Sequence, residues 1–173
     1  MSETSVAKTT SERNREIAHS LSNNLARLLR EFSKDFERRI YSQLAAHGFA
    51  DIRASHSAVF ANLGMGAVRV TELAERAQVT QQAMGKMLKE LEQKGYITRA
   101  IDTGDKRAKE IKMTEKGIEL TLVSLKIVDE IHEQYVELIG EQELYDLEER
   151  LRDAVGKLNL DYLPESWLEA NKM

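Results

Sequence analysis

The stretch that decides the fold is residues 70–117, which read VTELAERAQVTQQAMGKMLKELEQKGYITRAIDTGDKRAKEIKMTEKG. Apolar residues recur every three or four positions in its first half, in two short blocks that predict two helices joined by a very short turn. Thr71 and Thr80 are the expected N-caps of these helices, because a threonine hydroxyl accepts a hydrogen bond from a free backbone N–H. After Gly95 the helical period ends, and β-branched residues on either side of a charged tip at 102–107 predict a two-stranded hairpin.

The second of these helices is expected to have an apolar inner face and a polar outer face. The inner face comprises Ala83, Met84, Met87, Leu88 and Leu91. The outer face comprises Gln81, Gln82, Gly85, Lys86 and Lys89, and Glu90, Glu92 and Lys94 are expected to form a solvated face. In the major groove of DNA a glutamine can bond adenine, and a lysine can reach guanine or a phosphate. The pattern alone fits an ordinary solvated amphipathic helix equally well.

The hairpin tip favours the DNA-binding interpretation. It carries Lys106 and Arg107, and an arginine is favoured in the negative potential of the minor groove. Two helices followed directly by such a hairpin have the order of a winged helix-turn-helix. Residues 78–112 also hold eight Lys or Arg and five Asp or Glu, a net charge of +3 in a chain of net charge −4. The sequence therefore predicts a winged helix-turn-helix region at 51–113 that faces double-stranded DNA.

The segments on either side predict long helices. One apolar stripe marks a single helix over residues 11–48, after a disordered start at 1–10; it comprises Ile17, Leu21, Leu25, Leu28, Phe32, Phe36 and Ile40. A capping box of Thr9 and Glu12 is expected to begin this helix. Residues 114–173 predict two further helices and an apolar tail. The first of these helices carries a stripe of Ile118, Leu122, Leu125, Val128, His132, Tyr135 and Ile139. A domain this small offers these stripes too little partner surface, so a homodimer is expected.

Composition excludes several classes of protein. The 173 residues are 42% hydrophobic and 31% charged and include no Cys, which excludes disulfide scaffolds and thiolate metal sites. Neither a membrane span nor a signal peptide is expected, and the predicted location is the cytoplasm. The chain has no phosphate-binding glycine loop, no nucleophile elbow and no persuasive carboxylate pair, so neither an enzyme nor a bound cofactor is expected.

The four histidines give no recognisable metal motif. His19, His47, His56 and His132 are dispersed along the chain. His56 falls on the apolar stripe of a short helix before residue 64, where a hydrogen-bonded core histidine is the simplest expectation. No metal site is expected, although a zinc-responsive regulator stays open as an alternative. A winged helix used only as a protein-interaction module is the other alternative.

Residues 70–117 resemble the core of the MarR family of transcriptional regulators. The hallmarks are LAERAQVT for the supporting helix and turn, LKELEQKGYITR for the end of the recognition helix, and DTGDKR with MTEKG for the wing and the next helix. The resemblance implies a mainly α fold with a small β-hairpin wing, flanked by N- and C-terminal dimerisation helices. It also implies a homodimeric repressor that places two recognition helices in successive major grooves of a pseudo-palindromic operator.

The resemblance also assigns roles by position. Thr80 through Lys89 correspond to the recognition helix. Asp105, Lys106 and Arg107 correspond to the tip of the wing, where Arg107 is implied to enter the minor groove and Asp105 is implied to help hold the Arg107 side chain. Thr71 is the candidate phosphate contact. This sequence departs from many family members in having Gly85-Lys86 where they carry an arginine. Small-molecule effectors, commonly aromatic acids, are implied to bind between the dimer helices and the DNA-binding lobe, with His56 and Phe60 as candidate lining residues.

Overall fold

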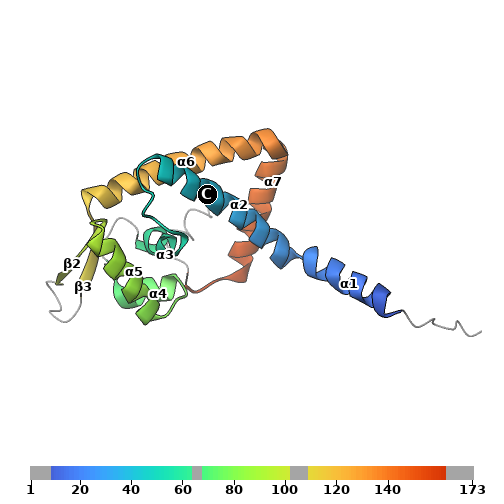
Figure 1. Ribbon diagram of the computed structural model, residues 1–173, viewed down its shortest axis with the longest axis horizontal. Helices are drawn as coiled ribbons and strands as arrows, with labels where there is room; N and C mark the ends of the chain where they lie inside the picture. The colour runs from blue at the N-terminus through green and yellow to red at the C-terminus, as the bar shows by residue number, and fades with distance from the viewer. Residues whose placement is uncertain (1–8, 64–67, 102–108, 163–173) are drawn as a thin grey trace, which may run out of the picture. The chain divides into compact units, whose positions relative to one another are not determined.

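The computed structural model describes residues 9–63, 68–101 and 109–162, and the described part is mainly helical with one small antiparallel sheet (Figure 1). The chain divides into two compact units, of which the first ends at Arg39 and the second begins at Ile40. None of the described helices is long and apolar enough to cross a membrane.

The first unit contains helix α1, Thr10–Ser22, and the beginning of helix α2, Leu25–Ala46. The capping box is confirmed: the Thr9 hydroxyl accepts a hydrogen bond from Glu12 N, and the Glu12 carboxylate accepts one from Thr9 N at 2.7 Å. The single helix expected over residues 11–48 is wrong, because the helical conformation is interrupted between α1 and α2 at Asn23 and Asn24.

The side chain of Asn24 explains this interruption. Its amide donates to Ser20 O at 2.9 Å, and its oxygen accepts from Arg27 N at 3.0 Å. Asparagine side chains compete with the backbone for hydrogen bonds in this way and favour helix ends. The apolar stripe continues across the break and is exposed on both helices; it comprises Ile17, Leu21, Leu25, Leu28, Leu29 and Phe32.

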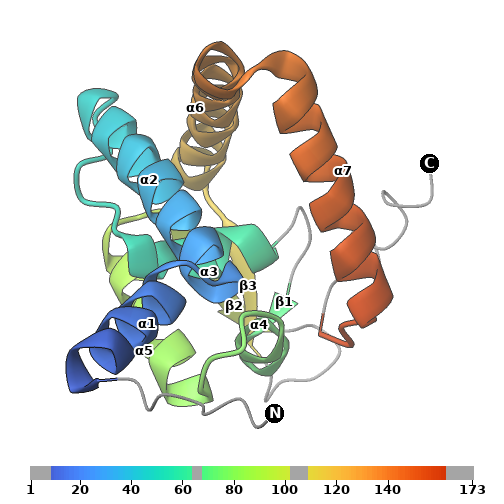
Figure 2. The ribbon, with the colours of Figure 1, turned by 90° about the vertical axis from the view of Figure 1, so that its right-hand side faces the viewer.

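The second unit contains the predicted helix-turn-helix and its wing. Helix α3, Ala54–Leu63, precedes strand β1, Val68–Arg69, and is followed by helices α4, Val70–Arg76, and α5, Gln81–Gln93. The predicted hairpin is confirmed as strands β2, Ile97–Ile101, and β3, Lys109–Met113. Strand β1 adds a third strand, in the order β1-β3-β2, and Figure 2 shows the sheet beside α4. Ile111 of β3 pairs with both Val68 and Arg99.

The two expected threonine caps have different outcomes. The Thr80 hydroxyl accepts a hydrogen bond from Ala83 N at 3.1 Å and caps α5 as predicted. The predicted cap at Thr71 is wrong, because α4 begins two residues earlier than that cap would place it. Its N-cap is Arg69, which makes no side-chain capping bond. Strand pairing of Val68 and Arg69 with β3 fixes the chain up to that point, so the helix starts directly after the strand.

Two long helices complete the second unit: α6, Glu115–Ile139, and α7, Glu141–Leu158, which meet at Gly140. The apolar stripe predicted on α6 lies mostly outside the face that packs within this unit. Of its members only Tyr135 is buried, whereas Leu122 is 62% and Leu125 58% exposed. The face that packs within the unit comprises Gly117, Leu120, Ile127, Ile131 and Tyr135. Helix α6 is apolar on two faces, so periodicity alone does not tell which face packs inside the chain.

Candidate nucleic-acid interface

Helix α5 has one buried apolar face and one exposed polar face. Met84, Leu88 and Leu91 are fully buried, which fixes the rotation of the helix about its axis. The predicted outer residues Gln81, Gln82, Lys86 and Lys89 are all exposed, with Gly85 half-buried among them. A Cβ atom built on Gly85 would meet no other atom within 4 Å. The expectation that Ala83 belongs to the inner face is wrong, since this residue is exposed.

The wing and the supporting helix are described in part. Asp105, Lys106 and Arg107 lie outside the described residues, although the two strands that lead to them are in place. Thr71 is exposed in the first turn of α4. Arg76 at the end of α4 bonds Glu72 and also donates to Asn62 O at 3.2 Å, which ties α4 to the end of α3.

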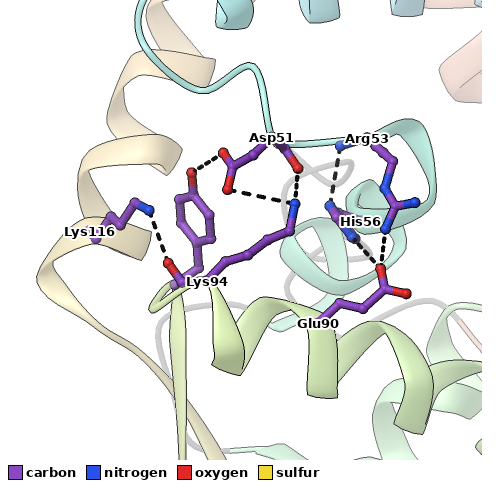
Figure 3. A network of polar contacts seen from close by, with 7 residues as sticks. Asp51, Arg53, His56, Glu90, Lys94 and Lys116 are labelled. Carbon is purple, nitrogen blue, oxygen red and sulfur yellow. Dashed lines mark hydrogen bonds and ion pairs between the residues drawn. The ribbon is translucent and has the colours of Figure 1, made fainter.

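The far end of α5 is bound to α3 through Glu90. Figure 3 shows Arg53 and His56 reaching the Glu90 carboxylate, with His56 Nε2 at 3.2 Å from Glu90 Oε2. His56 is fully buried, which confirms the expected core histidine. The expectation that Glu90 belongs to a solvated face is wrong, because its carboxylate pairs with His56 of α3 and with Arg53 directly before α3.

The hydrogen bonds of His56 define its protonation. Arg53 N donates to Nδ1 at 3.2 Å, so Nδ1 is an acceptor and Nε2 carries the proton that Glu90 accepts. Burial lowers the pKa of His56 below its ordinary value of 6.5, although the hydrogen bond to Glu90 acts in the opposite direction. That same bond, with the Arg53 guanidinium nearby, lowers the pKa of Glu90 below 4.5. The pair is therefore a neutral histidine and an ionised carboxylate at neutral pH.

A second contact joins the end of α5 to Asp51. The Tyr96 hydroxyl donates to Asp51 Oδ1 at 2.7 Å, and the Lys94 ammonium donates to the Asp51 carbonyl. Burial raises the pKa of Asp51, but the Tyr96 hydrogen bond and the charges of Lys94 and Lys116 outweigh it, so the pKa lies below 3.8. Burial and the Asp51 carboxylate raise the pKa of Tyr96, which keeps its hydroxyl a donor. The expectation that Lys94 belongs to a solvated face is therefore wrong as well, because its ammonium group is bound to Asp51.

Glu92, the third residue of the expected solvated face, is exposed as expected and also has a charged partner. Glu92 Oε2 lies 3.0 Å from Arg99 Nε, and Arg99 belongs to β2. This ion pair joins α5 to β2, the first strand of the hairpin. The last turn of α5 thus contacts α3, the segment before α3, and β2, while the outer face of its first turns is exposed to solvent.

An apolar cavity of about 320 Å³ lies between the end of α2, α3 and α6. Its volume falls in the lower range of small-molecule sites. Phe60 lines it as expected, but His56 does not, because its ring faces Glu90 instead. The other lining residues are Ile40, Tyr41, Leu44, Ile52, Ser57, Ala61, Leu120, Thr121, Ser124, Leu125 and Val128. Among the described residues, no three His, Asp or Glu side chains are grouped to hold a metal ion.

Comparison with known proteins agrees with this architecture. Residues 64–109 match the model of the MarR family. The HTH-type transcriptional regulator SarZ of Staphylococcus haemolyticus is 28% identical over 142 residues, covering 82% of this chain and 93% of that protein. The exopolysaccharide II synthesis transcriptional activator ExpG of Rhizobium meliloti is 30% identical over 96 residues, and the match spans only 50% of its length.

Solved structures share the same fold. The reduced form of MarR from E. coli has a TM-score of 0.67 at 23% identity, covering 76% of this chain and 96% of that one. A cysteine-to-serine mutant of the same protein complexed with operator DNA has a TM-score of 0.63, also at 23% identity. At such identity the likeness concerns the fold, and the family match concerns the helix-turn-helix and wing. On these grounds residues 64–109 match the MarR family, and the described fold is that of the winged helix-turn-helix proteins to which the chain is similar.

Proposed function

We propose that this protein is a transcriptional regulator that binds double-stranded DNA sequence-specifically as a homodimer and acts as a repressor. The observation that carries the proposal is the outer face of α5, where Gln81, Gln82, Lys86 and Lys89 are exposed above a fully buried base. The major groove admits one helix, and glutamine and lysine side chains on its first turns can reach base edges and phosphates. The open space above Gly85 allows a close approach of backbone and DNA.

The other parts of the site have distinct proposed roles. Arg107 enters the minor groove next to the recognition helix, with Asp105 holding it and Lys106 adding charge, and Thr71 contacts a phosphate. These contacts mainly add affinity and fix the register, whereas the contacts from α5 discriminate between bases. MarR of E. coli, whose fold this chain shares, has been solved with operator DNA, which supports the assignment of DNA as the partner.

The proposed dimer uses the apolar side chains that the chain leaves exposed. The stripe on α1 and α2 includes Leu21 and Leu28, exposed by 67% and 56%, and the second unit exposes Leu138 and Leu158. Exposed apolar surface of this extent is typical of an interface. A second copy of the chain is proposed to bury the exposed apolar side chains of both units. It also supplies the second recognition helix that a pseudo-palindromic operator requires.

Regulation by a small organic effector is the last element of the proposal. The cavity is lined mainly by apolar groups, and Phe60 offers an aromatic wall for an aromatic acid or a similar compound. A ligand lowers DNA binding only by its differential affinity for a form that does not fit the operator. A tenfold loss of DNA affinity requires about 1.4 kcal/mol of such preference.

Footprinting on the DNA upstream of the protein's own gene tests the proposal. Protection of two half-sites about one helical turn apart, at 34–36 Å, is the expected result. Protection without sequence preference would favour a protein-interaction module. Adding aromatic acids or zinc separately then identifies the effector class, and release by zinc alone would favour a zinc-responsive regulator. A reporter gene that loses expression when the protein is removed would indicate an activator, as ExpG is named.

A further inference from the structure

The turn that ends the recognition helix is held by the start of α6. Three consecutive carbonyls of this turn each accept a hydrogen bond: Lys94 O from Lys116 Nζ at 2.9 Å, Gly95 O from Thr114 Oγ1 at 2.7 Å, and Tyr96 O from Thr114 N at 3.0 Å. Gly95 has φ +77°, a conformation that strongly favours glycine. These three hydrogen bonds and the conformation of Gly95 therefore hold the chain as it leaves α5.

The side chains on either side of Gly95 converge on one acidic residue. Tyr96 donates its hydroxyl to Asp51 Oδ1 at 2.7 Å, and Lys94 donates to the Asp51 carbonyl, with its ammonium 3.6 Å from Oδ2 (Figure 3). Asp51 lies in the segment between α2 and α3, outside the helix-turn-helix itself. Asp51 thus holds both Lys94, the C-cap residue of α5, and Tyr96, which lies two residues further along the chain.

The tyrosine ring has little freedom to move. Tyr96 is fully buried, and its ring lies 6.3 Å from the rings of both Phe49 and Phe60, edge-on to the latter. The Lys116 ammonium lies 4.1 Å from the centre of the ring. A ring packed on several sides keeps its hydroxyl in one place. The hydrogen bond from this hydroxyl therefore fixes the position of Tyr96 relative to Asp51.

We propose that Asp51 is a positioning residue for DNA recognition, which sets the tilt of α5 through Lys94 and Tyr96. This inference rests on the proposed function. A helix of 13 residues is about 20 Å long, so a tilt of roughly 5° at its last turn moves its first turn by roughly 1.7 Å. Hydrogen bonds to bases tolerate only a few tenths of an ångström, whereas contacts to phosphates through long side chains tolerate more. Loss of the Asp51 contacts therefore reduces discrimination between sequences more than it reduces general affinity for DNA.

The test compares the affinity for operator DNA with the affinity for shuffled DNA of the same length, for full-length protein. Asp51→Asn weakens the contacts to Tyr96 and Lys94 with little change in shape, and Tyr96→Phe removes the hydroxyl while keeping the ring. Each variant is expected to lose about tenfold in operator affinity, with shuffled-DNA affinity within about twofold of the wild type. Asp129→Asn, an exposed position on α6, is the matched control and is expected to change neither affinity.

The outcomes separate the inference from the function on which it rests. Wild-type protein that does not distinguish the two DNAs contradicts the proposed function. Wild-type protein that does distinguish them, together with unchanged operator affinity in both variants, contradicts the role of Asp51. An equal loss for both DNAs, accompanied by a lower melting temperature, indicates a purely structural role and also overturns the inference. Tyr96→Phe decides the matter if Asp51→Asn does not fold.

Discussion

His56 on α3 donates through Nε2 to Glu90 on α5, at 3.2 Å, while its Nδ1 accepts from Arg53 N. This arrangement requires a neutral imidazole, since a proton on Nδ1 would point at the Arg53 N–H. Glu90 also pairs with the Arg53 guanidinium, so one carboxylate of α5 joins a side chain of α3 and the residue directly before that helix. The packing of the two helices thus depends on the protonation of a buried side chain.

Acid is expected to destabilise the fold through His56. In the unfolded chain His56 binds a proton with the ordinary pKa of 6.5, whereas in the folded protein its pKa is lower. Between these two pH values the unfolded state therefore binds more protons than the folded state. The contribution of His56 to the free energy of unfolding is complete above pH 6.5 and declines as the pH falls below that value. Denaturant unfolding followed from about pH 7 to pH 5 measures this decline. His56→Gln, which does not titrate, should show a flatter profile; an unchanged profile would contradict the role of His56.

Gly85→Ala is expected to separate folding from DNA binding. Alanine is favoured over glycine inside a helix by roughly 0.5–1 kcal/mol, and the added Cβ meets nothing within 4 Å, so the free protein becomes more stable. If the α5 backbone approaches DNA at this point, the same methyl group weakens operator binding. Gly156→Ala on α7 also has free space and is the control: it should stabilise the fold and leave DNA binding unchanged. Equal operator affinity for both variants would place Gly85 away from the DNA.

The helix and the wing are expected to contribute differently to recognition. Gln82→Ala or Lys86→Ala should reduce operator affinity by about 1–3 kcal/mol and relax the preference at one base position, because base contacts discriminate. Arg107→Ala should weaken binding to many sequences alike. Selection of binding sites from a random DNA pool, performed with each variant, measures both effects. If Arg107→Ala altered the base preference and left the affinity intact, the two roles would have to be exchanged.

The dimer is expected to depend on the exposed stripe of α1 and α2. Replacing both Leu21 and Leu28 by serine removes apolar surface that a partner would bury, and each fully buried leucine contributes about 1.5–3 kcal/mol. Analytical ultracentrifugation should therefore show a weaker dimer, and operator binding should weaken with it. Arg13→Ser on α1 is the polar control and should leave the association constant unchanged. A wild-type protein that sediments as a stable monomer at micromolar concentration would refute the dimer.

Local signals predict much of the helix-turn-helix and the wing. The Thr80 cap, the end of α5 at Gly95 and the two strands of the hairpin all depend on residues close together in sequence, and each is confirmed. The break between α1 and α2 has a local signal too, the pair Asn23-Asn24, but the apolar stripe continues through it. Periodicity was therefore a weaker guide there than the side-chain chemistry of asparagine.

The contacts that position α5 have no local signal. Asp51 and Tyr96 are 45 positions apart, and His56 and Glu90 are 34 apart, so nothing near either residue predicts its partner. A charged residue near the end of an amphipathic helix is usually solvated, which is why Glu90, Glu92 and Lys94 were expected on a solvated face. The face of α6 that packs within the chain has no local signal for a related reason: the helix has two apolar faces, and only tertiary structure shows which of them packs inside the chain.

The affinity of the wild-type protein for its own upstream DNA, measured by fluorescence anisotropy beside shuffled DNA over a series of salt concentrations, tests the central claim most directly. Both affinities should fall steeply with salt, since four to eight phosphates neutralised per dimer give a slope of roughly −4 to −7 in log affinity against log salt. The upstream DNA should bind at least about a thousandfold more tightly at physiological salt. Equal affinity for the two DNAs at every salt concentration would contradict sequence-specific recognition by α5.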